Sequence, residues 1–293
     1  MSLLTENEFG RVYQAPLSQG LTALVIEHAK GTAKVSLYGG QVLSWQSCGE
    51  KDVFWLSKNS HFQQGKAIRG GIPLCWPWFG QHPDDSDNQW GNHGFARSQV
   101  WQLDAVKISE QGVELSLLWQ GENMAPLWPY PCQLTQGLFF GDSFKQTLKM
   151  HNLSEQDAYY TGALHSYFSV SSPENIKVSA LEQACFDDKL TGKSYEPQAL
   201  NNGVGPIDRI YHSNNEMTLI DNYWKRAINL KAFNTNQWVF WNPGAKVAAN
   251  MPDIHINGEQ EFVFLEAANT NMTVIPAKES VSISQEITIS TLD

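Results

Sequence analysis

Apolar and polar residues alternate one by one in many short segments of the chain. The clearest alternation lies at residues 35–38, 113–117, 148–150, 228–232 and 281–289. A period of two is typical of half-buried strands, in which one face meets the core and the other meets solvent. We find no sustained segment with the three-and-four spacing of an amphipathic helix. The pattern therefore predicts an all-β protein.

Turn signals separate these segments, at Gln111-Gly112, Asn201-Asn202-Gly203, Asn242-Pro243-Gly244 and Asn257-Gly258. Short connections of this kind join antiparallel neighbours, whereas parallel strands need crossovers of a dozen or more residues. A doubly wound α/β fold therefore fits poorly. No repeat or linker divides the chain, so we expect one large antiparallel β-sandwich domain over residues 1–293.

Composition narrows the classes of partner. Hydrophobic residues make up 42% of the 293 residues and charged residues only 17%, which is typical of a folded protein with a large core. The net charge is −10, and the basic residues are scattered, so we expect neither nucleic acid nor an anionic membrane as a partner. An anionic substrate would need local arginines or backbone amides.

Cellular location and redox state are predicted from simpler signals. The four cysteines are far apart and form no C-x-x-C pair, so we expect reduced thiols. The first residues show no basic segment followed by an apolar one, and no window approaches 18 uninterrupted apolar residues. We therefore expect a cytoplasmic protein.

Two segments near residue 80 combine glycine with candidate binding residues. In residues 69–80 an aromatic run is interrupted by Gly and Pro, so Arg69 could reach an anion while Trp76, Trp78 or Phe79 offers a flat face to a sugar ring. The simpler alternative is that these aromatic side chains fill the core.

In residues 92–97, His93 and Arg97 flank a glycine that would let the backbone approach a ligand. The alternative is a solvated loop.

Three further polar residues stand in or beside strand-like segments. His165 is a lone histidine, for which a hydrogen-bonded core position is the simpler interpretation. Glu266 follows four apolar residues, and a carboxylate at the end of a buried strand is costly unless it is hydrogen-bonded or used. Asp208 could accept hydrogen bonds from substrate hydroxyls or form a surface pair with Arg209.

Taken in order, the motifs of these segments resemble the aldose 1-epimerase superfamily, and within it the glucose-6-phosphate 1-epimerases. The motifs are RGGIP from residue 69, HGFAR from 93, LHSYF from 164, DRIY from 208, FWNP from 240 with a downstream Met-Pro-Asp, and FVFLEA from 262. Six motifs in the same order form a far more specific signal than any one of them. The resemblance implies a galactose-mutarotase-like β-sandwich without a metal or organic cofactor.

The resemblance also implies roles for individual residues. His165 would be the general acid and Glu266 the general base in the interconversion of the anomers of a hexose 6-phosphate, with glucose 6-phosphate as the first candidate. The substrate-binding residues would be Arg69, Asn92, His93, Arg97 and Asp208, with the two arginines as phosphate and substrate contacts and Asp208 at a sugar hydroxyl. The partner would be a small sugar phosphate, and the protein a monomer or weak homo-oligomer.

Three alternatives remain open at this stage. A mutarotase for unphosphorylated aldoses would share the acid and base but lack the anion site. A non-catalytic carbohydrate-binding sandwich could use the 11 tryptophans for stacking, but it would leave Glu266 without a role. A metal-dependent isomerase of the cupin type could use His82, His93 and the nearby Asp residues as ligands, although the paired histidines of cupins are missing.

Overall fold

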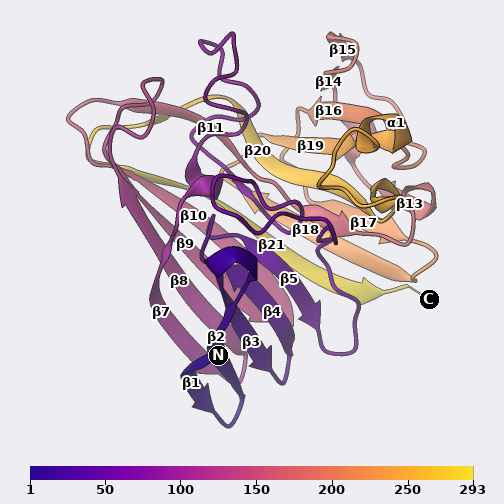
Figure 1. The fold of residues 1–293 in the computed structure, drawn as a ribbon. Coiled ribbons are helices and arrows are strands. Elements are labelled where there is room, and N and C mark those ends of the chain that lie inside the picture. The colour runs from indigo at the N-terminus through magenta and orange to yellow at the C-terminus, as the bar shows by residue number, and fades with distance from the viewer. Residues whose placement is uncertain (293) are drawn as a thin grey trace.

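The computed structural model describes residues 1–292 and consists almost entirely of antiparallel strands (Figure 1). It confirms the prediction of an all-β sandwich. Every pair of neighbouring strands within the sheets is antiparallel, although many connections run between strands that are distant in sequence. Within the described residues there is one α-helix, α1 (Gly244–Ala248), and five single-turn 3₁₀ helices, at Ser18–Gly20, Ala96–Ser98, Pro173–Asn175, Leu181–Gln183 and Gly258–Gln260.

The strands form three sheets. The N-terminal sheet contains, in spatial order, β1 (Ser2–Asn7), β2 (Gly10–Pro16), β3 (Thr22–His28), β4 (Gly31–Ser36) and β5 (Val42–Ser47). The second sheet has the order β13 (Ile176–Val178), β17 (Met217–Asp221), β18 (Arg226–Phe233), β21 (Ser280–Thr291), β10 (Ser143–Asn152), β9 (Cys132–Gly141), β8 (Gly112–Gly121) and β7 (Gln102–Ser109).

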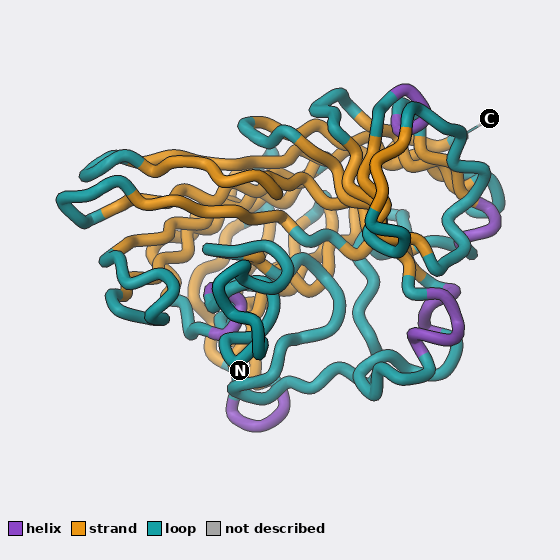
Figure 2. The backbone as a smooth tube through the Cα atoms, turned by 90° about the horizontal axis from the view of Figure 1, so that it is seen from above, coloured by secondary structure: helices purple, strands orange, loops and turns teal. Residues whose placement is uncertain are grey.

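The third sheet, which we call the site sheet, has the order β15 (Lys193–Tyr195), β14 (Phe186–Asp188), β16 (Ile207–Tyr211), β19 (Gln237–Asn242), β20 (Phe262–Ile275), β11 (Ala158–Leu164) and β6 (Leu74–Cys75), with β12 (Tyr167–Ser169) also paired to β20. Figure 2 shows the strands as the layered body of the molecule, with loops and short helices at the rims.

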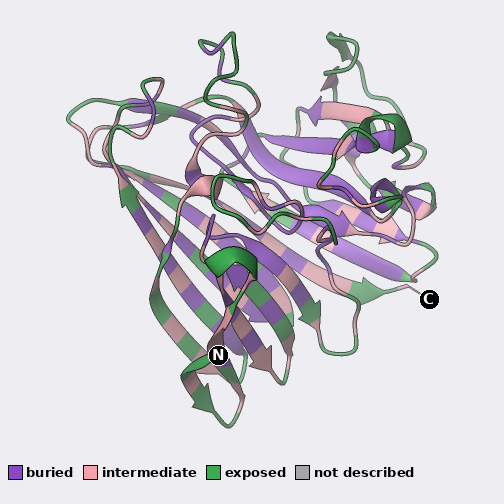
Figure 3. Cartoon of the chain, viewed as in Figure 1, coloured by how far each residue is buried: buried purple, intermediate pink, exposed green. Residues whose placement is uncertain are grey.

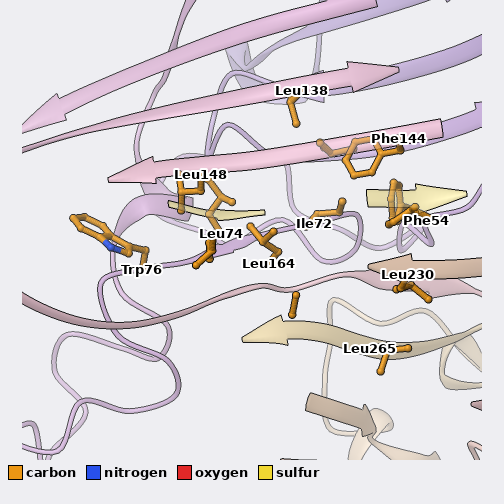
Figure 4. Close-up of a cluster of buried hydrophobic side chains, with 14 of the residues drawn as sticks. Phe54, Ile72, Leu74, Trp76, Leu138, Phe144, Leu148, Leu164, Leu230 and Leu265 are labelled. Atoms are coloured by element: carbon orange, nitrogen blue, oxygen red, sulfur yellow. The ribbon is translucent and has the colours of Figure 1, made fainter. Parts of the chain in front are cut away.

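The predicted alternation is visible along β7 to β10, where buried and exposed residues follow one another (Figure 3). The buried positions meet side chains of the other sheets in one large apolar cluster, of which Figure 4 shows Phe54, Phe144, Leu138, Leu230 and Leu265. The four cysteines are free, as predicted. No helix in the described part of the chain is long and apolar enough to cross a membrane.

Strand β20 differs from this pattern because both of its faces are covered over its first eight residues (Figure 3). Val263, Leu265 and Ala267 enter the large core, whereas Phe262 and Phe264 join a separate apolar cluster on the opposite face. The near-continuous apolar sequence before Glu266 therefore reflects a strand with two buried faces.

Candidate active site

All seven residues proposed from the sequence line one pocket of about 490 Å³. They are Arg69, Asn92, His93, Arg97, His165, Asp208 and Glu266. The volume falls within the usual range for small-molecule sites. Residues separated by long stretches of sequence therefore meet around one space of the size of a monosaccharide derivative.

A larger hollow of about 730 Å³ lies over β7 to β10. Its charged residues include Lys107 and Glu114, whose side chains are 72% and 57% exposed and lie 3.9 Å apart. Solvent-exposed ion pairs of this kind contribute little to stability and do not indicate a catalytic site. We therefore place the candidate site in the smaller pocket, which contains the buried ionisable groups.

The floor of the pocket is one face of the site sheet. Side chains alternate between faces along a strand, so Leu265 of β20 enters the core while Phe264 and Glu266 face the pocket. On β19, Phe240 enters the core, and Val239 and Trp241 line the pocket. The period of two thus determines which residues of each strand reach the substrate space.

His165 lies in the short break between β11 and β12 and faces Glu266 of β20. Leu164 lies opposite Ala267, and Tyr167 lies opposite Phe264, so the same register sets His165 opposite Glu266. His165 Nε2 and Glu266 Oε1 are 3.7 Å apart, and the side chains are only 7% and 2% exposed. Directly opposed side chains are among the closest neighbours in a sheet, which explains how two distant residues meet.

Burial shifts both members of this pair toward their neutral forms. It lowers the pKa of His165 to about 3, and the positive charges of Arg97 and Arg69 act in the same direction. Burial, together with the carboxylate of Asp208, raises the pKa of Glu266 well above its usual range, although Arg97 opposes this shift. His165 Nδ1 and Glu266 Oε2 are buried without hydrogen-bond partners in the described structure. In the free pocket, burial therefore favours a neutral imidazole and a protonated carboxyl group.

Arg69 is held in place by two partners. Its Nε and Nη2 both lie 2.9 Å from Asp253 Oδ2, and its Nη1 donates to the Tyr167 hydroxyl at 2.9 Å. Burial disfavours the guanidinium charge, but Tyr167 and Asp253 outweigh burial and raise the pKa of Arg69. The charge of Arg69 is therefore largely compensated within the protein.

Arg97 lacks such compensation. Its Nη2 donates to the backbone oxygen of Asn92 at 2.6 Å, and no carboxylate lies within 4.0 Å of it among residues 1–292. Asn92 is exposed at the rim, and its carbonyl orients the guanidinium. Arg97 is thus better suited than Arg69 to bind an anionic group of a ligand.

His93 presents a hydrogen-bond donor to the pocket. Its Nδ1 accepts a hydrogen bond from the Gly80 backbone at 3.2 Å, so the proton of the neutral ring is on Nε2. Burial, followed by the charge of Arg97 and, more weakly, that of Arg69, lowers the pKa of His93 and favours the neutral ring. His93 can therefore donate to a ligand oxygen through Nε2.

The donor atoms of Cys75, His93 and His165 lie within 4.8 Å of one another, which is close enough to consider a metal ion. Their chemistry does not fit one. The lone pair of His93 Nδ1 is used by Gly80, so Nε2 carries the proton and neither ring nitrogen of His93 is free to bind a metal. His82 of the cupin alternative is not part of this group, and its Nδ1 accepts from the Asp84 backbone.

Comparisons with known proteins show the family to which the chain belongs. The family model described as aldose 1-epimerase matches residues 22–288. The chain belongs to this family. An Escherichia coli K12 protein named "Putative glucose-6-phosphate 1-epimerase" is 32% identical over 265 residues, which are 88% of this chain and 87% of that protein.

Solved structures extend the likeness to the fold of this aldose 1-epimerase family member. A Salmonella typhimurium structure described as a "putative mutarotase" is 30% identical, with a TM-score of 0.87 over 99% of this chain and 96% of that one. A galactose mutarotase-like protein from Clostridium acetobutylicum is 14% identical, with a TM-score of 0.77 over 98% and 100% of the chains, and shows the shared fold. The predictions of superfamily and fold are confirmed.

Several details of the family member's pocket differ from the expectations. Trp76 and Trp78 are buried in the core, so of the three aromatic candidates only Phe79 lines the pocket. Gly94 is needed for packing against protein rather than ligand, since a Cβ there would lie 2.1 Å from Trp76 O and its φ is +68°.

Sequence reasoning missed other pocket residues. The pocket has an apolar wall formed by Trp241, Met251 and Phe264. Its lining also includes the cation Lys189, which lies near Asp208. Asp253, the partner of Arg69, stands in the Met-Pro-Asp segment that was noted only as part of a motif. Trp241 and Phe264 follow from strand alternation once the pocket face is known, but no local signal marks Lys189.

Proposed function

We propose that this protein interconverts the α and β anomers of a hexose 6-phosphate, with glucose 6-phosphate as the first substrate to test. The observation that supports this most is the buried pair of His165 and Glu266 in the same pocket as Arg97, a cation without a carboxylate partner among residues 1–292. The name of the Escherichia coli relative points to the same substrate.

The reaction needs one acid and one base acting on neighbouring atoms. A base removes the proton of the anomeric hydroxyl O1 while an acid protonates the ring oxygen O5, and the C1–O5 bond breaks to give an open-chain aldehyde. Rotation about C1–C2 and closure on the other face of the carbonyl, with the roles reversed, produces the other anomer. Each proton transfer is general acid–base catalysis, which contributes about 10²–10⁴-fold.

In this proposal Glu266 acts as the base at O1 and His165 as the acid at O5. The neutral pair of the free pocket carries the same number of protons as an imidazolium and a carboxylate. Transfer of one proton from Glu266 to His165 therefore converts the pair into the carboxylate base and the imidazolium acid that the reaction needs. A substrate phosphate beside Arg97 and Arg69 would offset two of the charges that lower the pKa of His165 and so favour the imidazolium.

The connectivity of the substrate agrees with the placement of the arginines. O5 and the phosphate-bearing C6 are both attached to C5, so the acid that serves O5 and the phosphate site must be neighbours. Arg97 and Arg69 both act electrostatically on His165, and all three residues line the pocket. We therefore place the phosphate at the His165 end.

Exchange NMR or polarimetry of glucose 6-phosphate tests the proposal. We expect the wild-type protein to accelerate anomer exchange, and His165→Ala and Glu266→Gln each to lose nearly all of this acceleration while remaining folded. Retention of most activity by either variant would exclude the pair. Equal kcat/KM for glucose and glucose 6-phosphate would instead support a mutarotase for unphosphorylated aldoses.

Four further expectations stay predictions from the sequence. They are a single domain, a cytoplasmic location, a monomer or weak homo-oligomer, and the lack of a nucleic-acid partner.

A further inference from the structure

Lys189 lines the candidate pocket but belongs to a surface hairpin that carries none of the residues proposed from the sequence. It occupies the turn between β14 and β15. Its backbone N–H donates to the backbone oxygen of Asp208 at 2.8 Å, which ties the turn to β16. The main chain of Lys189 is therefore fixed to the strand that carries a proposed sugar contact.

Side-chain contacts of Asp188 and Arg209 hold the hairpin in its conformation. Asp188 Oδ1 accepts hydrogen bonds from the N–H groups of Leu190 and Thr191, both at 3.0 Å, as in an Asx turn. Asp188 Oδ2 also lies 3.5 Å from Arg209 Nε, and the Arg209 guanidinium stacks on Phe186 at 4.4 Å. The other carboxylate beside Lys189 is that of Asp187, whose two oxygens accept hydrogen bonds from Ser194 Oγ at 2.6 Å and His212 Nε2 at 2.9 Å. The Ser194 hydrogen bond lowers the pKa of Asp187, and the Lys189 charge contributes to this lowering. Neither aspartate of the hairpin, however, forms an ion pair with the Lys189 ammonium.

Lys189 and Asp208 are both unpaired at the pocket. Within residues 1–292, no carboxylate lies within 4.0 Å of the Lys189 ammonium, and the Asp208 carboxylate accepts no hydrogen bond. Asp208 is half-buried, and the positive charge of Lys189 partly offsets the rise in its pKa that burial causes. The pocket therefore presents a hydrogen-bond donor and an acceptor near each other.

A neighbouring donor and acceptor match two adjacent hydroxyl groups of a sugar. One hydroxyl can donate to the carboxylate while the next accepts from the ammonium, and the two hydrogen bonds polarise each other. Across the site sheet the order is β14, β16, β19, β20 and β11. Lys189 and Asp208 thus lie at the opposite side from His165, where the ring edge that does not react would be placed.

We propose that Lys189 is a substrate-binding residue that, together with Asp208, recognises two adjacent ring hydroxyls on the edge of the sugar away from O5. This inference rests on the proposed function for the identity of the sugar phosphate. It assigns to the β14–β15 hairpin a role in selecting the hydroxyl configuration of the substrate.

Lys189→Met tests the inference because it removes the charge and keeps the length of the side chain. Lys193→Met is the matched control, since Lys193 is an exposed lysine of the same hairpin that does not line the pocket. We expect Lys189→Met to weaken glucose 6-phosphate binding and raise KM by about 5- to 20-fold, with kcat within about twofold, as for loss of uniform binding. The control should change neither value more than about twofold.

Deoxy analogues identify the contact. With 2-, 3- and 4-deoxyglucose 6-phosphate, the effect of Lys189→Met should fall below about twofold for the analogue that lacks the recognised hydroxyl. An undiminished effect with all three analogues overturns the inference, as does an equal effect of the control. An effect that disappears with unphosphorylated glucose would place Lys189 at the phosphate and also overturn it.

Titration calorimetry separates this inference from the proposed function. If the wild-type protein binds glucose 6-phosphate without accelerating anomer exchange, the proposed reaction fails while the role of Lys189 in binding is still measured. If anomer exchange is accelerated but Lys189→Met binds as the wild type does, only the role of Lys189 is refuted.

Discussion

Replacement of Glu266 by Gln should separate activity from stability. Glu266 is 2% exposed, its Oε2 lacks a hydrogen-bond partner in the described structure, and its Oε1 lies 3.7 Å from His165 Nε2. Gln has nearly the same shape but cannot accept the proton from O1. The expected loss is that of one general base, about 10²–10⁴-fold in kcat, which corresponds to about 3–5 kcal/mol in the activation barrier.

The same substitution should stabilise the fold at higher pH. Because the pKa of Glu266 is raised in the folded state, the folded protein holds this proton more tightly than the unfolded chain does. The contribution of Glu266 to stability is therefore complete below its unfolded pKa and is lost as pH rises through its folded pKa. Gln does not titrate, so the melting temperature of Glu266→Gln relative to wild type should increase with pH.

Thermal unfolding at several pH values, together with exchange NMR of glucose 6-phosphate, measures both effects. A gain of about 1 kcal/mol would raise the melting temperature by roughly 2–4 °C in a protein of this size class. A difference that shrinks with increasing pH would refute the assignment of a protonated Glu266. Retention of more than about a tenth of the activity would refute its role as the base.

Three other substitutions test the surroundings of the pair. Arg97→Ala should reduce kcat/KM for glucose 6-phosphate by at least about tenfold more than for glucose in the same exchange assay, and equal losses would remove the phosphate assignment. Asp253→Asn should destabilise the protein by about 1–3 kcal/mol in urea unfolding, less than for a fully buried pair because the Arg69 and Asp253 side chains are 23% and 17% exposed. An unchanged urea midpoint would show that Arg69 does not depend on Asp253. Gly94→Ala should cost about 2 kcal/mol or more in the same experiment, since its Cβ would lie 2.1 Å from Trp76 O; a neutral effect would contradict the proposed close approach.

The strands were predictable because their alternation records which face is buried. Segments around Leu115, Met150, Ile228 and Ile283 show this period and form strands β8, β10, β18 and β21. At residues 242–244 the chain does leave strand β19, but it enters the short helix α1 at Gly244 instead of turning directly into another strand. Local composition indicates that the chain turns there, but it does not specify the short helix that follows.

The site was only partly predictable, because the sequence does not reveal strand register. As a lone histidine in the sequence, His165 was most simply interpreted as a core residue. Only the pairing of β11 and β12 with β20 places it opposite Glu266. The aromatic run around Trp76 was ambiguous because its bent backbone has no simple period. No feature of the sequence distinguishes Lys189 from other surface lysines. Only the tertiary structure brings its hairpin to the pocket.

The pairing of His165 and Glu266 across a β-ladder has a consequence for how such a pocket can diversify. Strand pairing on both sides of the two residues fixes their separation, so the spacing of the proposed acid and base does not depend on the conformation of the rim. Rim segments such as the β14–β15 hairpin and the loop at residues 81–92 can therefore accept insertions or substitutions that alter sugar preference. A shift of one residue in this strand pairing could not be tolerated in the same way, because it would turn one partner into the apolar interior and abolish the proposed reaction.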